Sequence, residues 1–417
     1  MSTLLSDFDG TVFTNPARFG DEEGWHAAVA ELRARDTLHK VEVEGFPPFW
    51  AIVKHADILQ IEQKPELFPS TKRVELESLE ATRVAEEAGT APETLVHMDG
   101  AKHRQYRDLT AGWFKPSALR KTMSESVSSL AREYVDRMSG LGGECDFADD
   151  VAKLYPLRVI MSMLGVPPQD EPLMLTLTQR VMAPADPEYT LTGSYAEDHA
   201  AVIQEVFGYF FALAAARRAD PASDIASVIA NGAVDGQPLG DMETLSYYLI
   251  LAAAGHDTTS ASIAAGLEAL IRDPGQLRLL QAEPDRLPNA VEEIFRWASP
   301  VKQFTRTATA DYQLRGATIK AGDRVLLSFQ SANRDEEVFH DPFRFDVTRG
   351  NARGHLGFGA GKHFCLGAPL ARMEMAAFFA ELLGRLESAE ITGPVERSHG
   401  TTVAGIKHLP IRFTFKH

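Results

Sequence analysis

The sequence predicts a mainly helical protein with a smaller β-rich region at one side. Residues 116–230 follow a helical pattern that is broken only by turns rich in Gly, Pro and Asp. A second long helical pattern covers residues 241–273. After Pro300 the chain changes to short alternating segments bounded by glycines, which is typical of strands. We therefore expect a small amount of sheet at the edge of a helical body.

Size and composition are those of an ordinary globular protein. The 417 residues are 44% hydrophobic and 24% charged, and they show no internal repeat. We expect one domain over residues 1–417, in which residues 1–40 form a poorly defined N-terminal segment. No apolar run reaches the roughly 18–20 residues of a membrane span, and no signal peptide is recognisable. Two cysteines are too few for a disulfide framework, so we expect a cytoplasmic protein without a membrane anchor.

The charge of the chain limits its partners. A net charge of −16 argues against binding to nucleic acid or to anionic membranes, because those surfaces attract basic proteins. One stretch is basic in spite of this average. It is either a solvated helix face or a docking surface for an acidic redox partner. Its residues are Lys102, Arg104, Arg107, Lys115, Arg120 and Lys121.

The first hundred residues combine strands, helices and a loop. Residues 41–53 alternate and turn like a β-hairpin, and residues 55–63 follow a helical pattern. Residues 67–96 have weak periodicity and many polar residues, so we expect a long, partly ordered loop. A helix is predicted over residues 97–107, with Asp99 as its N-cap. His103 and Arg107 are four residues apart on this helix and could reach the same anion or form a surface pair.

Five helices are predicted in the middle of the chain. They cover Ser117–Ser139, Asp149–Leu164, Glu171–Met182, Glu197–Arg218 and Ala222–Ala230. Residues 183–194 contain two prolines and no periodicity, which predicts a connection between two helices.

The helix over residues 241–273 contains a weak point at its middle. Gly255 and two adjacent threonines destabilise a helix, and a threonine hydroxyl can bond to a carbonyl one turn earlier. We expect the hydrogen-bond ladder to open there, with small alanines that let a flat cofactor or O2 approach. Asp257 and Thr258, an acid beside an alcohol, could relay protons. A simple kink in a buried helix would also explain this stretch.

The region after residue 290 begins with a possible ion pair and continues as strands. Glu293 and Arg296 are three residues apart on a helical segment, a common spacing that carries little information alone. Strands are predicted at Phe304–Ala308, Tyr312–Leu314, Ala317–Ile319, Arg324–Phe329, Thr401–Ile406 and Ile411–Phe415.

A glycine-rich stretch near the C-terminus holds the most informative residue. Residues 355–367 read HLGFGAGKHFCLG, and a helical pattern follows over residues 368–386. Cys365 therefore lies where a loop becomes a helix. The free amides and the helix dipole at this position favour a thiolate, the form that ligates a metal. An inert, packed cysteine is the alternative.

Three motifs in this order resemble those of the cytochrome P450 superfamily: A-G-x-D-T at 254–258, E-x-x-R at 293–296 and F-G-x-G-x-H-x-C-x-G at 358–367. The resemblance covers residues 40–417. It implies a P450-like helical fold with haem b buried between the long central helix and the cysteine loop. Several scaffold stretches look most similar to the terpineol-hydroxylating branch.

The resemblance also implies roles for individual residues. Cys365 would be the thiolate ligand of the iron, with Phe358 near the sulfur. Thr258 would hold dioxygen and water, and Asp257 would supply protons. Gly100-Ala101 stand where the family more often has two prolines, so the helix entry is expected to differ slightly. The expected haem propionate contacts are His103, Arg107, Arg306 and His363. The expected substrate pocket contains Ala253, Ala254, Val301 and Val403.

The function implied by the resemblance is insertion of one oxygen atom from O2 into a C–H bond of a small hydrophobic substrate. The chain lacks a G-x-G-x-x-G unit and a cysteine cluster, so electrons from NAD(P)H would arrive through a separate ferredoxin and reductase. A monoterpenoid or alkylaromatic substrate is favoured, with a steroid or a fatty acid as alternatives. A peroxide-driven peroxygenase would share Cys365 but not need Asp257 and Thr258. A haem sensor or carrier would bind the cofactor without turnover.

Overall fold

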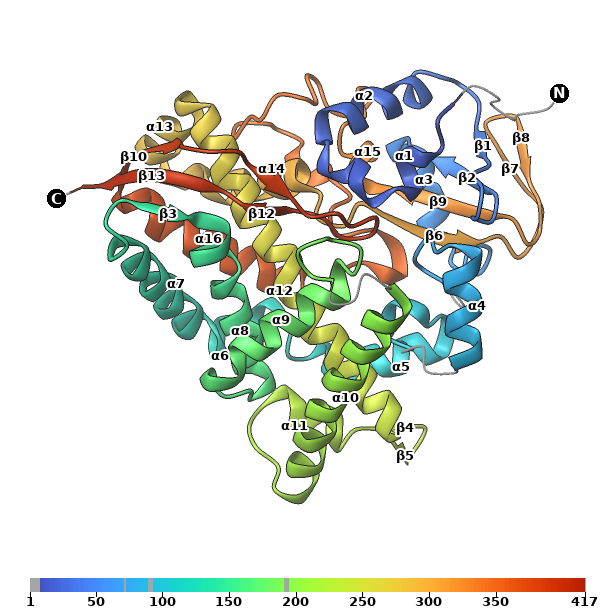
Figure 1. The fold of residues 1–417 in the computed structure, drawn as a ribbon, viewed down its shortest axis with the longest axis horizontal. Coiled ribbons are helices and arrows are strands. Elements are labelled where there is room, and N and C mark those ends of the chain that lie inside the picture. Colours follow the sequence, from blue (N-terminus) through green and yellow to red (C-terminus); the bar gives the residue numbers. More distant parts are fainter. Residues whose placement is uncertain (1–7, 71–72, 89–92, 191–194, 417) are drawn as a thin grey trace.

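The computed structural model describes residues 8–70, 73–88, 93–190 and 195–416, and it has the predicted mainly helical fold with a smaller β region (Figure 1). Its helices are α1 (Thr11–Thr14), α2 (Glu22–Arg33), α3 (His55–Glu62), α4 (Leu79–Ala88), α5 (Gly100–Ala111), α6 (Pro116–Thr122), α7 (Ser124–Ser139), α8 (Leu154–Leu164), α9 (Glu171–Met182), α10 (Tyr195–Ala219), α11 (Ile225–Ala230), α12 (Asp241–Arg272), α13 (Pro274–Ala282), α14 (Leu287–Ala298), α15 (Phe329–Ala332) and α16 (Ala368–Arg385).

The largest sheet joins distant parts of the chain. Its strand order is β1-β2-β9-β6, and β2 runs parallel to β9, so the N-terminal hairpin lies beside strands from the last third of the sequence (Figure 1). The bounds are β1 (His39–Val41), β2 (Phe49–Ile52), β6 (Gln303–Thr307) and β9 (Arg324–Ser328). In the register of β6 against β9, Arg306 pairs with Val325.

The remaining strands form small sheets. They are β3 (Glu144–Asp146), β10 (Leu386–Ile391) and β13 (Pro410–Phe415), in the order β10-β13-β3. The two-stranded pairs are β4 (Ala233–Val234) with β5 (Gln237–Pro238), β7 (Tyr312–Leu314) with β8 (Ala317–Ile319), and β11 (Glu396–Arg397) with β12 (Ile406–His408). The predicted strand over 401–406 is therefore replaced by one that begins at Ile406.

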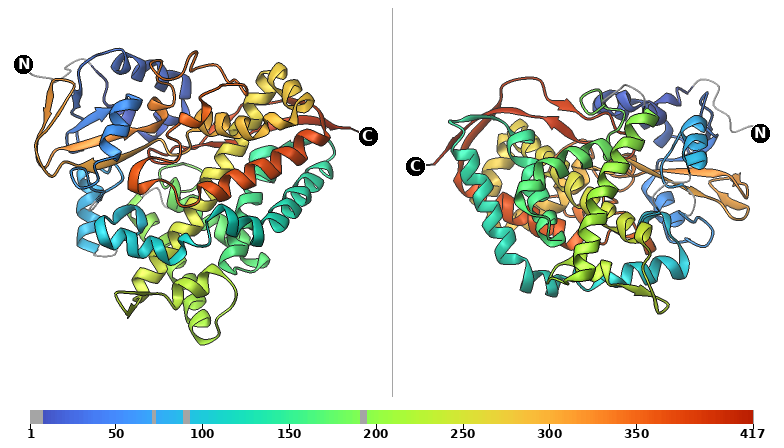
Figure 2. Two further views of the ribbon diagram at one scale, coloured as in Figure 1. Left: turned by 180° about the vertical axis from the view of Figure 1, so that it is seen from behind. Right: turned by 60° about the horizontal axis from the view of Figure 1, so that its bottom comes forward.

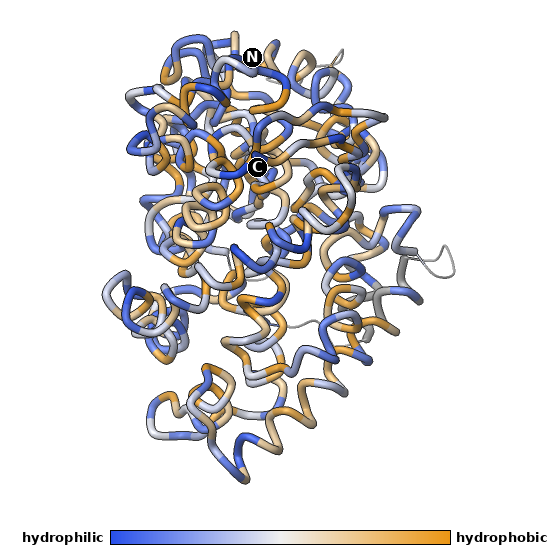
Figure 3. Tube along the Cα trace, turned by 90° about the vertical axis from the view of Figure 1, so that its left-hand side faces the viewer, coloured by the Kyte–Doolittle hydropathy of each residue, from blue (hydrophilic) through white to orange (hydrophobic). Residues whose placement is uncertain are grey.

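The central helix α12 organises the helical body. It packs against α8, α14 and α10, and α16 lies against both α12 and α7 (Figure 2). Hydrophobic and hydrophilic residues alternate along the outer helices, as expected when each helix buries one face (Figure 3). No helix in the described part of the chain is both long and apolar enough to cross a membrane.

The predicted interruption of the central helix is absent, because α12 is continuous through Gly255. The expected back-bonding does occur: the Thr258 hydroxyl donates to the Ala254 carbonyl at 2.9 Å. Gly255 has a packing role instead. A Cβ atom there would lie 2.8 Å from Cγ1 of Ile160 on α8, closer than real Cβ contacts allow. The small residue therefore lets α12 and α8 approach closely.

Two segments contain more regular structure than the sequence predicted. Within the expected loop 67–96, α4 begins where the Ser78 hydroxyl accepts the Ala81 N–H at 3.1 Å. In residues 1–40, α2 begins where the Asp21 carboxylate accepts the Gly24 N–H at 3.0 Å. Trp25 and Val29 on α2 are buried, so this helix is part of the core. Of the predicted connection 183–194, residues 191–194 lie outside the described part of the chain.

The Glu293–Arg296 pair is fully buried rather than solvated. Arg296 donates to both Glu293 oxygens at 2.7 Å, and Arg349 joins the same carboxylate at 3.1 Å. Arg296 also donates to the carbonyls of Asn333 and Pro342, at 2.8 and 2.9 Å. These bonds fix the segment that leads into the cysteine loop. Removing one partner of such a buried network costs about 3–5 kcal/mol.

Candidate functional site

A cavity lies between α12 and the loop that carries the cysteine. Its empty space is about 1400 Å³ when the part open to solvent is included, and most of its wall is apolar. All six residues expected to contact a cofactor line it, namely His103, Arg107, Arg306, Phe358, His363 and Cys365. The structure therefore brings together side chains that lie more than 250 residues apart in the sequence.

Cys365 is held by a tight loop just before α16. Its N–H donates to the Phe358 carbonyl at 2.9 Å, and Gly359 and Gly361 both have positive φ angles, of 66° and 63°. A Cβ atom at Gly361 would lie 2.1 Å from the Glu62 carbonyl oxygen, so only glycine fits there. The loop is thereby pressed against the end of α3.

The thiol of Cys365 does not ionise readily in this fold. Burial raises its pKa above the ordinary value, while the amides of Gly367 and Ala368 and the charge of Arg107 act in the opposite direction. The predicted amide contribution is present, but burial outweighs it. A coordinated metal cation deprotonates a thiol outright, so a metal bound at Cys365 would produce the thiolate in spite of this burial.

The opposite wall of the cavity is formed by α12. Ala254, Gly255 and Thr258 line it, and so does Thr259, a residue outside the predicted site. Asp257 is not among the described lining residues; its side chain is 16% exposed, and Oδ1 lies 3.1 Å from Nδ1 of the buried His256. The other carboxylate oxygen, Oδ2, is buried and has no hydrogen-bond partner within the described part of the chain.

Basic and imidazole side chains cluster on one side of the cavity. The rings of His103 and His363 stack with their centroids 4.4 Å apart, and Arg107 donates to the Phe364 carbonyl at 2.8 Å. Burial, together with His363 and Arg107, lowers the pKa of His103 to about 4. Asp99 occupies the predicted N-cap position of α5, but its carboxylate contacts His363 Nε2 at 3.1 Å.

Glu62 is a cavity residue that no sequence motif indicates. Its Oε1 accepts a hydrogen bond from Arg306 Nη2 at 2.8 Å, and Oε2 accepts the Ala360 N–H at 3.4 Å. Both side chains of the Glu62–Arg306 pair are almost completely buried. No local pattern could have indicated this contact, because it depends on how α3 packs against the cysteine loop and β6.

Two of the four residues expected in a substrate pocket line the cavity. Ala254 and Val301 do so, whereas Ala253 is buried one helical step away, because successive helix residues point about 100° apart. Val403 forms an isolated bridge with Val301 and is likewise not among the lining residues. Further apolar lining comes from Val74, Leu95, Val96, Ile250, Leu251 and Phe304.

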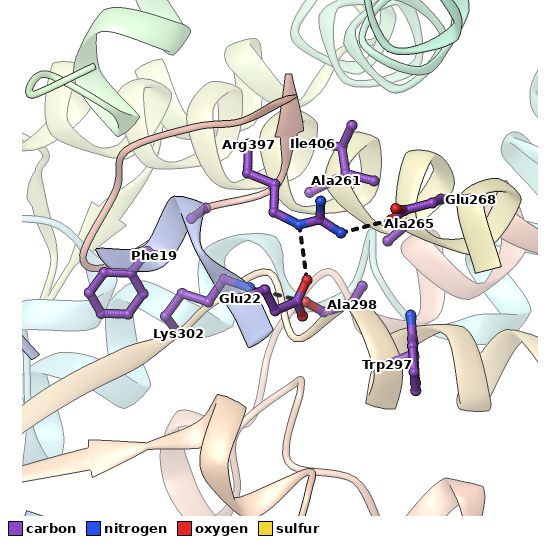
Figure 4. Close-up of a pocket in the computed structure, with 12 residues that line it drawn as sticks. Phe19, Glu22, Ala261, Ala265, Glu268, Trp297, Ala298, Lys302, Arg397 and Ile406 are labelled. Carbon is purple, nitrogen blue, oxygen red and sulfur yellow. Dashed lines mark hydrogen bonds and ion pairs between the residues drawn. The ribbon is translucent and has the colours of Figure 1, made fainter. Parts of the chain in front are cut away.

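A second, small pocket is polar and filled by its own charges (Figure 4). Arg397 on β11 bonds Glu22 at 2.9 Å and Glu268 at 2.8 Å, joining α2 to α12. Burial lowers the pKa of the neighbouring Lys302 to about 8. These paired charges connect the elements behind the cavity and leave no opening for a large ligand.

The residues around the large cavity fit an iron porphyrin. The Cys365 sulfur faces an apolar space, and basic side chains line the same cavity, where acidic groups of a cofactor could bind. Thr258 faces the same space from α12. The cavity can therefore hold a flat apolar group with a sulfur ligand on one side and an apolar chamber on the other.

Comparisons with known proteins agree with this arrangement. The family model "Cytochrome P450" matches residues 80–415. Cytochrome P450-terp from Pseudomonas sp is 41% identical, with 96% of each chain covered. Steroid C26-monooxygenase from Mycolicibacterium smegmatis is 33% identical, covering 99% of this chain and 95% of the relative. The crystal structure of CYP108D1 from Novosphingobium aromaticivorans matches with a TM-score of 0.89 at 38% identity, covering 98% of this chain and 99% of that one.

Proposed function

The chain belongs to the cytochrome P450 family of haem b monooxygenases, and from this premise we propose that it hydroxylates a small hydrophobic molecule, with a monoterpenoid or alkylaromatic favoured. The observation that carries the proposal is that Cys365 and Thr258 line one apolar cavity from opposite walls. We also propose that residues 1–417 form a single domain, since α2 and β1 pack into the same body as the matched residues.

The proposed roles of the binding residues follow from their positions. Cys365 holds the iron through its sulfur, and Phe358 packs beside it. His103, Arg107, Arg306 and His363 bind the propionates, and Glu62 orients the Arg306 guanidinium. When bound, the haem supplies the activation of O2 and the oxidation of the substrate C–H bond.

The proposed proton relay uses two neighbouring residues of α12. The Thr258 hydroxyl faces the cavity and can hold a water molecule at Oγ1 while it donates to the Ala254 carbonyl. The Asp257 carboxylate does not line the cavity, so we propose that it passes protons to that water through further water molecules; its Oδ2 has no hydrogen-bond partner among the described residues. His256 fixes the other oxygen of Asp257 from a fully buried position. A peroxygenase or a haem carrier would not need this pair.

The substrate is proposed from the chemistry of the wall. Val74, Leu95, Val96, Ile250 and Val301 offer no charge, so a neutral apolar molecule is favoured. The similarity to Cytochrome P450-terp supports a terpenoid. A steroid remains the second candidate, supported by the similarity to Steroid C26-monooxygenase.

We propose that a ferredoxin docks on the basic surface of α5 and α6. Arg104, Arg120 and Lys121 are exposed there, and Phe364, next to Cys365, is 40% exposed. Charge reversal by Arg120→Glu should slow reduction by an acidic ferredoxin. Arg278→Glu on α13, far from α5 and α6 in Figure 1, is the matched control and should leave the rate unchanged. Equal rates for both variants would contradict this docking site.

The substrate proposal is tested by titrating the ferric protein with terpineols, other monoterpenoids, alkylbenzenes, steroids and fatty acids while following the Soret band. A shift with terpenoids or alkylbenzenes alone is expected, and a shift with steroids alone would favour the second candidate.

The assignment of Cys365 as the iron ligand is tested separately. Cys365→Ser should abolish the red-shifted Soret band of the ferrous carbon monoxide complex, and a surviving band would refute it.

A further inference from the structure

One buried carboxylate binds several side chains behind the cysteine loop. Glu292, on α14, accepts two hydrogen bonds from Arg372 of α16, at 2.8 and 3.0 Å, and its Oε2 lies 3.1 Å from His355 Nε2. Arg353 approaches from solvent at 3.4 Å. Burial alone would raise the pKa of Glu292, but the bonds from His355 and Arg372 lower it to about 2. Glu292 is therefore a carboxylate throughout the working pH range.

The protonation of His355 follows from its own contacts. Its Nδ1 accepts the Gly357 N–H at 3.0 Å, so the ring hydrogen is on Nε2 and is donated to Glu292. Burial lowers the pKa of His355, which keeps the ring neutral. The charge that balances Glu292 inside the protein is therefore that of Arg372.

This ion pair lies one aromatic ring away from the cysteine backbone. The Arg372 guanidinium carbon is 4.6 Å from the centroid of the Phe358 ring, a distance typical of a cation–π contact. Phe358 lines the cavity, and its carbonyl accepts the Cys365 N–H. The three residues thus form a continuous contact from α14 to the sulfur-bearing residue.

We propose that the opposing charges of Glu292 and Arg372 tune the reduction potential of the haem through Phe358 and Cys365, each offsetting the effect of the other. This inference rests on the proposed role of Cys365 as the iron ligand. Adding one electron to the iron is favoured by nearby positive charge and disfavoured by nearby negative charge. Glu292 is buried and Arg372 is 29% exposed, so these charges are screened less than on the open surface, and each now offsets the other. Removing either one leaves its partner uncompensated, so the two removals must act with opposite signs.

The test compares two neutralised variants of the holoenzyme by redox titration of the ferric–ferrous couple. Arg372→Met should lower the potential and Glu292→Gln should raise it, each by about a tenfold change in the equilibrium constant, or about 59 mV for one electron. The ferrous carbon monoxide spectrum is recorded first for each protein. A band typical of thiolate ligation shows that Cys365 is still bound, and its absence in the unaltered protein would remove the basis of the inference.

Two controls separate an electrostatic effect from damage to the fold. Arg353→Gln changes a side chain that contacts the same carboxylate but is 80% exposed, and it should leave the potential unchanged. Arg372→Lys retains the charge, so its reduction potential should lie closer to that of the unaltered protein than the potential of Arg372→Met does. If Glu292→Gln does not take up haem, the comparison of the two Arg372 variants decides the question. Shifts of the same sign in Glu292→Gln and Arg372→Met, or equal shifts in both Arg372 variants, would overturn the proposal.

Discussion

Replacing Gly255 with alanine tests whether the close approach of α12 and α8 is what requires glycine there. Alanine favours a helix over glycine by about 1 kcal/mol, which would stabilise the variant. The new Cβ atom, however, would lie 2.8 Å from Ile160 Cγ1 and 3.0 Å from Cδ1. Overpacking of this kind costs about 1–3 kcal/mol. We expect Gly255→Ala to change stability by between zero and about 2 kcal/mol, in the destabilising direction.

The effect of Gly255→Ala on stability should change from destabilising to stabilising when the obstructing atoms of Ile160 are removed. Ile160→Ala deletes both close carbons and leaves only Cβ, at 3.4 Å from the new methyl group. In that background Gly255→Ala should stabilise by up to about 1 kcal/mol, giving a coupling of about 1–3 kcal/mol between the sites. Gly208→Ala on α10 is the matched control, because no other element among the described residues comes within 4 Å of the added atom. It should stabilise by about 0.5–1 kcal/mol.

The assay is denaturant unfolding of all five proteins with their cofactor content held equal, since bound haem adds to apparent stability. A Gly255→Ala effect that is equal in both backgrounds would refute the packing explanation. The glycine would then have to be required by the cavity or by the helix itself.

Three other predictions use separate features of the structure. Thr258→Ala removes the hydroxyl at the cavity wall, so hydroxylated product per electron pair should fall about tenfold or more while peroxide release rises; unchanged coupling would contradict the relay. Partial burial raises the pKa of Cys145 to about 12, so it should react with a thiol reagent at pH 8 far more slowly than an exposed cysteine, and fast labelling that Cys145→Ala abolishes would contradict this shift. The pKa of Lys302 is lowered from 10.5 to about 8, so between these pH values the unfolded chain binds more protons, and the contribution of Lys302 to stability rises with pH. The stability of Lys302→Met relative to the unaltered protein should therefore decrease from pH 7.5 to pH 10, and a constant difference would contradict the shift.

Most of the fold was predictable because its signals are local. The helix predicted over Glu171–Met182 has those bounds, and the strands at Tyr312–Leu314 and Ala317–Ile319 were also placed correctly. Hydrophobic periodicity, proline and glycine are local signals that involve only a few neighbouring residues. The elements that were predicted correctly are determined mainly by such signals. The helix α4 was missed because its start is set by the Ser78 cap within a polar stretch. The predicted helix over Ser117–Ser139 divides near Met123 into two helices.

The candidate site was predictable where a motif names its residues and not where packing selects them. Cys365, Thr258 and Arg306 line the cavity as expected. Glu62, which pairs with Arg306, comes from a helix whose sequence gives no sign of the contact. The choice of Ala254 over Ala253 depends on the rotation of α12, which side-chain packing sets and periodicity only approximates.

The two walls of the cavity are stabilised by different kinds of interaction. The α12 wall is fixed by close helix packing at Gly255, which can be adjusted gradually by small changes in volume. The cysteine wall is fixed by the buried networks of Glu292 and Glu293, neighbours on α14 that hold Arg372 and Arg296. A buried charge network tolerates little change, because any lost partner leaves a charge without compensation. We therefore expect the sequence differences that change substrate choice among relatives to lie mainly on the α12 wall. The cysteine wall should keep the same geometry and charge.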